Sequence, residues 1–143
     1  MLRKLIIICA VFASLLGIGF GVATKDDVLL SWKIANYHTA MAAGEYERAH
    51  TIANQMAVND YIPARTFLAG LYENGQGVIQ NLDIAVEQYK LAAMGNDVTA
   101  QVYLAGMYVS GHGVEASEQL AKHWYAKAAY NGHTTTQFKL ASR

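Results

Sequence analysis

Cysteine is almost missing from this sequence: the only one, Cys9, lies in an apolar stretch near the N-terminus. The rest of the chain can therefore form no disulfide, and it offers no thiolate as a nucleophile or metal ligand. Charge is also scarce, since only 15% of the residues are charged, against about 25% in typical soluble domains. The 11 basic and 11 acidic residues balance without forming a run of either sign, which disfavours nucleic-acid binding.

Motifs for metal or phosphate chemistry are absent as well. No two histidines are four residues apart, and no HExxH run places two imidazoles on one helix face. The Gly75-Gln76-Gly77 loop lacks the Lys-Ser or Lys-Thr pair of a phosphate loop, so we interpret it as a turn. The five histidines are interpreted as solvated or capping residues: His38, His50, His112, His123 and His133.

Carboxylates that cleave a glycosidic bond must face each other across that bond. The four candidate acids are expected instead in first turns or loops, where an acid favours the helix dipole. These acids are Asp83, Glu87, Glu115 and Glu118. The sequence therefore predicts no catalytic, cofactor-binding or metal-binding residue, and a protein that is not an enzyme.

The N-terminus combines a short basic head, Arg3 and Lys4, with an uncharged apolar run over residues 5–23. This pattern is typical of a secretory signal peptide, here with cleavage after Ala23. An uncleaved membrane anchor stays open, because a helix over this run would be about 28 Å long, close to the hydrocarbon thickness of a bilayer. The basic head should remain inside in either case. We therefore expect an exported protein, either periplasmic or anchored in the inner membrane with its folded domain on the periplasmic side.

The chain repeats itself with a period of 36 residues. A fixed period of this size is the signature of a solenoid built from stacked supersecondary units. Twelve of the residues between positions 64 and 93 recur unchanged 36 positions later. The first members of these identical pairs are Ala64, Leu68, Ala69, Gly70, Tyr72, Gly75, Gly77, Val78, Ala85, Tyr89, Ala92 and Ala93.

Each repeat is predicted to be a pair of helices. Apolar residues at helical spacings form one face of the first helix, namely Ala64, Leu68, Leu71 and Tyr72, and again Ala100, Leu104, Met107 and Tyr108. Glycines in 75–77 and 111–113 should end this helix, because glycine readily takes positive φ. Asn81 and Ser117 are suited to cap the second helix. Stacking of neighbouring pairs would then bury one continuous core.

The order of these residues resembles the Sel1-like repeat, a relative of the tetratricopeptide repeat. Residues 64–133 carry two near-complete copies, which differ where Gln88 in the first corresponds to Trp124 in the second. The resemblance implies binding rather than chemistry, since similar proteins act as adaptors in bacterial envelope processes and host interaction. Some exported relatives are cysteine-rich and have been linked to penicillin binding, and the lack of cysteine after residue 9 departs from that branch.

The predicted fold is all-α: a short right-handed α-solenoid of stacked antiparallel helix pairs, preceded by an N-terminal signal or anchor helix. Ala49, Ala53 and Ala57 lie one period before the second helix of the first repeat, so a divergent pair should precede it. We predict five segments: 1–23, a signal peptide or anchor; 24–60, a divergent tetratricopeptide-like pair; 61–96 and 97–132, two repeats; and 133–143, a polar capping half-repeat.

Aromatic residues could be taken for a ligand box. Their recurrence after 36 residues at helical spacing is, however, what packing between repeats requires. We therefore assign them to the core: Tyr72, Tyr89, Tyr108, Trp124 and Tyr125.

A partner is expected on the inner, concave face of the first helices, which is the usual docking surface of stacked helix pairs. By repeat register this face comprises Thr66, Gly70 and Glu73, and in the next repeat Val102, Gly106 and Val109. The leading hypothesis is a non-catalytic scaffold or adaptor of the bacterial cell envelope that binds a protein partner and needs no cofactor. Self-association is an open expectation, and so is membrane attachment through residues 5–23. The alternatives are a cell-wall (peptidoglycan) binding or hydrolysing protein and a secreted host-interaction factor.

Overall fold

A computed structural model describes residues 24–132, which form six helices and contain no strand. The predicted signal or anchor segment 1–23 and the predicted capping half-repeat 133–143 lie outside the described residues. Among the helices of residues 24–132, none is both long and apolar enough to cross a membrane. The all-α prediction is confirmed for this part of the chain.

The chain divides into two compact units, residues 1–35 and residues 36–143, and helix α2 (Lys25–Ala42) runs from one into the other. The described part of the first unit is the start of α2. There the Thr24 hydroxyl accepts a hydrogen bond from the Asp27 amide at 3.2 Å, and the Asp27 carboxylate accepts one from the Thr24 amide at 2.8 Å. This reciprocal pair is a capping box, which satisfies amide groups that the first turn of a helix leaves without partners.

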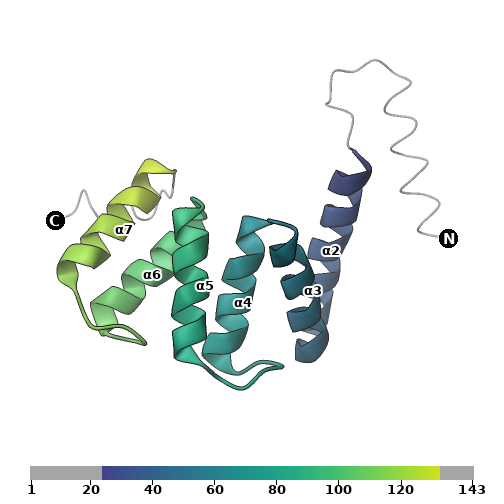
Figure 1. Ribbon diagram of the computed structural model, residues 1–143, viewed down its shortest axis with the longest axis horizontal. Helices are drawn as coiled ribbons and strands as arrows, with labels where there is room; N and C mark the ends of the chain where they lie inside the picture. Colours follow the sequence, from purple (N-terminus) through teal and green to yellow (C-terminus); the bar gives the residue numbers. More distant parts are fainter. Residues whose placement is uncertain (1–23, 133–143) are drawn as a thin grey trace, which may run out of the picture. The chain divides into compact units, whose positions relative to one another are not determined.

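After the end of α2, the described residues of the second unit form five helices of 13 residues each. They are α3 (Tyr46–Val58), α4 (Ile62–Asn74), α5 (Leu82–Met94), α6 (Val98–Ser110) and α7 (Glu118–Tyr130). They run alternately up and down in the view of Figure 1, with the longer turns 75–81 and 111–117 at the lower edge. The 36-residue period holds for the helix boundaries too, since α4 and α6 start 36 residues apart, as do α3, α5 and α7 in succession.

The predicted caps are confirmed in both repeats. The side chain of Asn81 accepts a hydrogen bond from the Ile84 amide at 3.0 Å, and that of Ser117 accepts one from the Leu120 amide at 3.3 Å. These bonds satisfy amides at the start of α5 and α7. The first helix of each pair ends on a glycine with left-handed backbone, Gly75 in α4 and Gly111 in α6.

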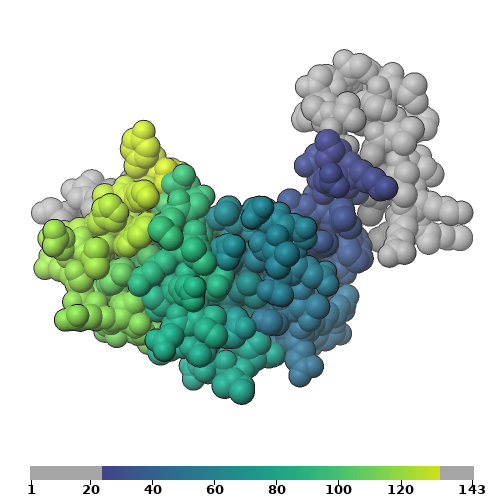
Figure 2. Space-filling view, in the orientation of Figure 1, coloured from purple at the N-terminus to yellow at the C-terminus, as the bar shows by residue number. Residues whose placement is uncertain are grey.

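The core lies between successive helices and contains mostly small residues, as the repeat pattern predicts. Alanines of α3 to α7 are buried between successive helices, which lets the helices approach closely. The space-filling view in Figure 2 shows that atoms fill the gaps seen between the ribbons of Figure 1. Larger residues such as Leu104 and Tyr89 complete the packing. Of the five aromatic residues assigned to the core, Tyr89 is buried, and the other four are half-buried: Tyr72, Tyr108, Trp124 and Tyr125.

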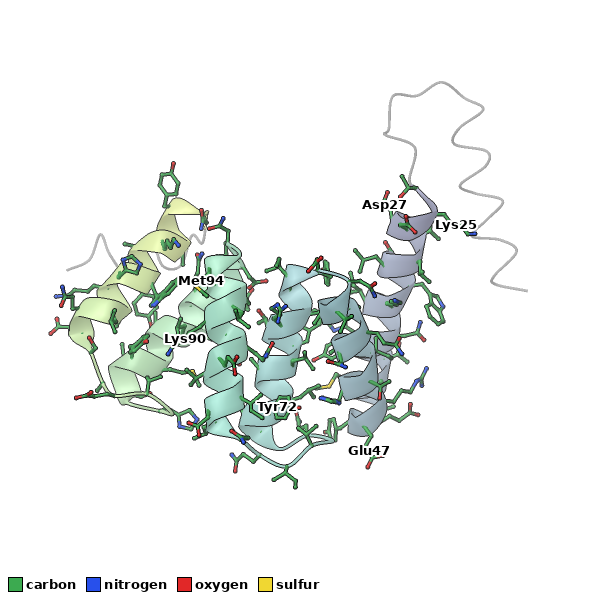
Figure 3. The ribbon with its side chains drawn as sticks, viewed as in Figure 1. Lys25, Asp27, Glu47, Tyr72, Lys90 and Met94 are labelled. Atoms are coloured by element: carbon green, nitrogen blue, oxygen red, sulfur yellow. The ribbon has the colours of Figure 1, made fainter. Side chains whose placement is uncertain are left out.

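Half-burial suits these four residues because a tyrosine or tryptophan can bury its ring while the polar end reaches water. Tyr108 and Trp124 pack against the edge of the buried cluster. Tyr72, labelled in Figure 3 on α4, places its ring edge-on to His50 of α3, with 5.5 Å between ring centroids. The prediction of a core role is therefore confirmed for Tyr89 and holds for these residues only at the border of the core.

One polar side chain, Gln101 of α6, lies fully buried in this apolar interior. Its amide nitrogen donates to the backbone oxygen of Ala93 near the end of α5, at 3.0 Å. Its amide oxygen accepts from the side chain of Asn131, which follows α7, at 3.2 Å. Gln101 thus joins three successive helices, and both ends of its amide have a partner, as burial of a polar group requires.

Candidate partner-binding surface

Most of the residues predicted to bind a partner are at least partly exposed on α4 and α6. Gly70, Glu73, Val102 and Gly106 are partly exposed, and Val109 is exposed over 62% of its surface. Thr66 contributes least, because its hydroxyl oxygen is buried and makes no hydrogen bond within the described residues. A further residue of α6, Tyr103, is also exposed.

Tyr103 is a large aromatic residue that remains 52% exposed. One face of its ring stacks on Tyr89 of α5, with 5.3 Å between centroids and 14° between planes. Phe67, one period earlier, also stacks on a tyrosine, but on Tyr37 of α2, at 4.4 Å and 11°. Phe67 and Tyr103 correspond to each other but are not identical, so a search for identical residues 36 positions apart does not detect them. A comparison by residue class would have found them.

Helix α6 is unusual because none of its 13 residues is charged. An apolar helix is normally buried on all sides, yet Tyr103 and Val109 of α6 are largely exposed. We call this surface the first-helix face. It consists of Gly70 and Glu73 of α4 and of Val102, Tyr103, Gly106 and Val109 of α6.

Glu73 is the one charged residue of the first-helix face. The hydroxyl of Tyr89 donates to its Oε2 at 2.9 Å, and Nε2 of His112, in the turn after α6, lies 3.5 Å from its Oε1. Burial, and then the negative charge of Glu73, raise the pKa of Tyr89. The hydroxyl therefore stays protonated and holds the carboxylate in place as a donor. The other charged residue of α4, Arg65, donates to Gln88 of α5 at 3.3 Å.

The two glycines of this face lie next to tyrosine hydroxyls from the second helices. A Cβ at Gly70 would lie 3.8 Å from Oη of Tyr89, and one at Gly106 would lie 4.0 Å from Oη of Tyr125. Both distances are ordinary van der Waals contacts. The close approach that glycine within a helix suggests is therefore that of a neighbouring helix, and an alanine would also fit.

Gly106→Ala is accordingly expected to raise the free energy of unfolding by about 0.5–1 kcal/mol, because alanine favours the helix more than glycine does. Urea unfolding of the variant should show a higher midpoint with an unchanged slope. Gly70→Ala, at the same register position, should behave alike. A clear loss of stability in both variants would contradict the packing described for Tyr89 and Tyr125.

The acids considered for glycoside cleavage do not form a paired site. Asp83 and Glu118 lie in the first turns of α5 and α7, and Glu115 lies in the turn between α6 and α7, as predicted. The prediction is wrong for Glu87, which lies beyond the first turn of α5. Its side chain is exposed there, so the helix continues past it without any packing cost. Residues 24–132 contain no group of three or more histidines, cysteines or acids that could hold a metal ion.

A shallow hollow of about 560 Å³ lies beneath the turn between α6 and α7. Lys90 of α5, labelled in Figure 3, borders it together with Tyr108, Glu115 and Leu120. The hollow brings one cation and one carboxylate to its rim rather than two carboxylates. It therefore does not offer the arrangement that glycoside cleavage requires.

The stacked helix pairs of the second unit define a class of protein, the α-solenoids, which use extended concave surfaces for binding. The profile of the Sel1 repeat matches residues 62–97 and again residues 98–133, together half of the chain. The protein therefore belongs to the Sel1 repeat family. Proteins built from Sel1 repeats generally mediate protein–protein interactions and are generally not catalytic.

Solved structures support the same fold. A Sel1 repeat protein from Oxalobacter formigenes is 30% identical, with a TM-score of 0.67 over 73% of this chain. A protective antigen of uropathogenic Escherichia coli strains, with an SLR fold, is 23% identical (TM-score 0.65, 80% of this chain). Helicobacter pylori cysteine-rich protein B is 22% identical (TM-score 0.60, 81% of this chain and 97% of its own).

The chain spans 43% of the Oxalobacter protein and 26% of the Escherichia coli antigen. No curated protein sequence is similar to this chain. At 23% and 22% identity, the likeness to the Escherichia coli antigen and to the cysteine-rich protein concerns the fold alone. The repeats of this chain contain no cysteine.

Proposed function

We propose that this protein is a non-catalytic adaptor of the bacterial cell envelope, which binds a protein partner on its first-helix face. The observation that carries this proposal is the exposed, uncharged side of α6, where Tyr103 and Val109 keep 52% and 62% of their surface accessible. Exposed apolar residues that lie together on one helix side are typical of interaction surfaces. Aromatic residues such as Tyr103 often provide most of the binding energy.

The envelope location rests on the N-terminal pattern, a basic head followed by an uncharged apolar run over residues 5–23. Export would place the repeats on the periplasmic side whether the segment is cleaved or retained. Cell fractionation and mass spectrometry of the protein's N-terminus test this part. Recovery in the cytoplasm with an intact N-terminus would contradict it.

A site-specific photo-crosslinker tests the binding surface in living cells. Placed at Val109 or Tyr103, it is expected to give a discrete crosslinked protein band, because both positions lie on the first-helix face. The matched control is Glu87 of α5, which is exposed but lies on a second helix. Equal crosslinking at Glu87, or none at Val109 and Tyr103, would overturn the proposed surface.

A further inference from the structure

The first-helix face carries a single charge, that of Glu73. Glu73 keeps 22% of its side chain exposed beside the apolar side of α6. A carboxylate that is partly removed from water loses hydration energy unless a donor or a cation compensates it. The hydroxyl of Tyr89 is one such donor, at 2.9 Å.

The second repeat shows that this tyrosine packs correctly without a carboxylate. Tyr125 corresponds to Tyr89, and it approaches Gly106 as Tyr89 approaches Gly70, at 4.0 Å against 3.8 Å. The residue that corresponds to Glu73 is Val109, which cannot accept a hydrogen bond. The ring contact therefore forms with a valine in that position, although the half-buried Tyr125 can direct its hydroxyl to water while the buried Tyr89 uses Glu73 as its acceptor. The charge of Glu73 is thus a feature of the first repeat alone.

The carboxylate is held beside an aromatic surface. Tyr89 donates to Glu73 through its hydroxyl, and the same Tyr89 ring stacks against one face of Tyr103. The other part of Tyr103 is open to solvent, since the residue is 52% exposed. A cation is attracted both by an aromatic face and by a carboxylate. Arginine can use both at once, because its planar guanidinium stacks on rings and forms hydrogen bonds to carboxylates.

The contact with His112 indicates the direction from which a cation can reach Glu73. Nε2 of His112 lies 3.5 Å from Oε1 of Glu73, and 48% of the His112 side chain is exposed in its turn. A nitrogen-bearing side chain therefore reaches this oxygen from the solvent side. Oε2 is meanwhile occupied by Tyr89.

Resting on the proposed function, we infer that the first-helix face recognises a protein segment in which one arginine is flanked by apolar residues. The guanidinium pairs with Glu73 and lies on the exposed part of Tyr103. The flanking residues contact Val102 and Val109. Charge complementarity carries this assignment, since Glu73 is the only charge that the face offers to a partner.

Three labelled peptides test this inference with the full chain in a non-ionic detergent. They share leucines around a central residue that is arginine, glutamine or glutamate. Fluorescence anisotropy should show that the arginine peptide binds about tenfold tighter than the glutamine peptide, as a charge-assisted hydrogen bond allows. The glutamate peptide should bind most weakly.

Variants of the chain show which residues cause the preference for the arginine peptide. Glu73→Gln is expected to remove the preference, so that the arginine and glutamine peptides bind equally. Tyr103→Leu should weaken the arginine peptide more than the glutamine peptide. Glu87→Gln removes an exposed charge from α5, outside the face, and should change nothing. Thermal melting of each variant separates a lost contact from a lost fold.

Several results would overturn the inference. One is equal binding of the arginine and glutamine peptides to the unaltered chain, and another is no binding of either. A third is sedimentation of the chain as a dimer that Val109→Glu dissociates, because a second copy would then occupy the face. The proposed function fails separately, through the absence of crosslinks at Tyr103 and Val109 in cells.

Discussion

Leu104→Asp is expected to lower the free energy of unfolding by at least about 4 kcal/mol and to abolish or strongly lower the thermal transition of the repeats. Leu104 is fully buried in the cluster formed by α4, α5 and α6, among residues such as Tyr89, Ala92 and Met107. An aspartate there would lose the apolar contacts and also leave a carboxylate in an apolar interior without a cation. The carboxylate's lost hydration is the larger cost.

Leu120→Asp is the matched control, because it makes the same chemical change at a leucine that is 42% exposed. Leu120 lies in the first turn of α7, where an acid is favoured by the helix dipole. We expect a cost below about 1 kcal/mol there. Circular dichroism at increasing temperature compares the two variants with the unaltered chain. Equal melting temperatures for both would show that the register assigned to α6 is wrong.

The repeat was predictable from the sequence because identical residues 36 positions apart occupy equivalent places in the structure. Ala64 and Ala100, or Ala85 and Ala121, are buried at equivalent places between helices. The caps follow local rules, since Asn81 bonds the amide three residues later within its own turn. Local chemistry and a fixed period therefore account for the helix boundaries of α4 to α7.

Contacts that break the period could not be predicted in this way. Gln101 corresponds to Arg65 in the first repeat, so no recurrence marks it as a buried polar residue. Its bonds join residues of α5 and the end of α7, which lie 8 and 30 positions away. The bond from Tyr89 to Glu73 is hidden for the same reason, because Val109 takes the place of Glu73 in the second repeat.

Repeat register groups the candidate residues on one helix side but does not reveal their chemistry. Repeat register places Gly70, Glu73, Val102, Gly106 and Val109 on one side of the first helices, because helical spacing alone decides that. Register does not reveal which side chains reach over from the second helices. Tyr89 is such a residue: its hydroxyl holds the carboxylate of Glu73, and its ring stacks on Tyr103.

At Gly77, the sequence predicts the positive φ of the turn but not the residues that the turn contacts. A Cβ at this position would overlap the carbonyl carbon of Tyr46 and lie 2.5 Å from the Glu47 amide nitrogen. The turn after α4 is thus pressed against the start of α3, in the preceding helix pair. Backbone atoms cannot swing aside as a side chain can, so an added methyl group must displace the turn or the helix.

Gly77→Ala is therefore expected to cost more than about 3 kcal/mol, of which the left-handed backbone accounts for about 1–2 kcal/mol. Gly113→Ala is the matched control, with the same φ of 70° and the same register position. The two atoms nearest to a Cβ there would belong to side chains, Val86 Cγ2 at 3.1 Å and Leu82 Cβ at 3.3 Å. Its cost should stay close to that of the backbone alone.

Urea unfolding of the two variants isolates the contact between the turn and α3. The difference between them should exceed about 1 kcal/mol, because the backbone strain is common to both and cancels. Equal midpoints would mean that the turn does not press on the first residues of α3 in solution. A larger loss for Gly77→Ala would instead establish that the turn after α4 packs against the start of α3 in solution, and that this close backbone contact is specific to the first repeat.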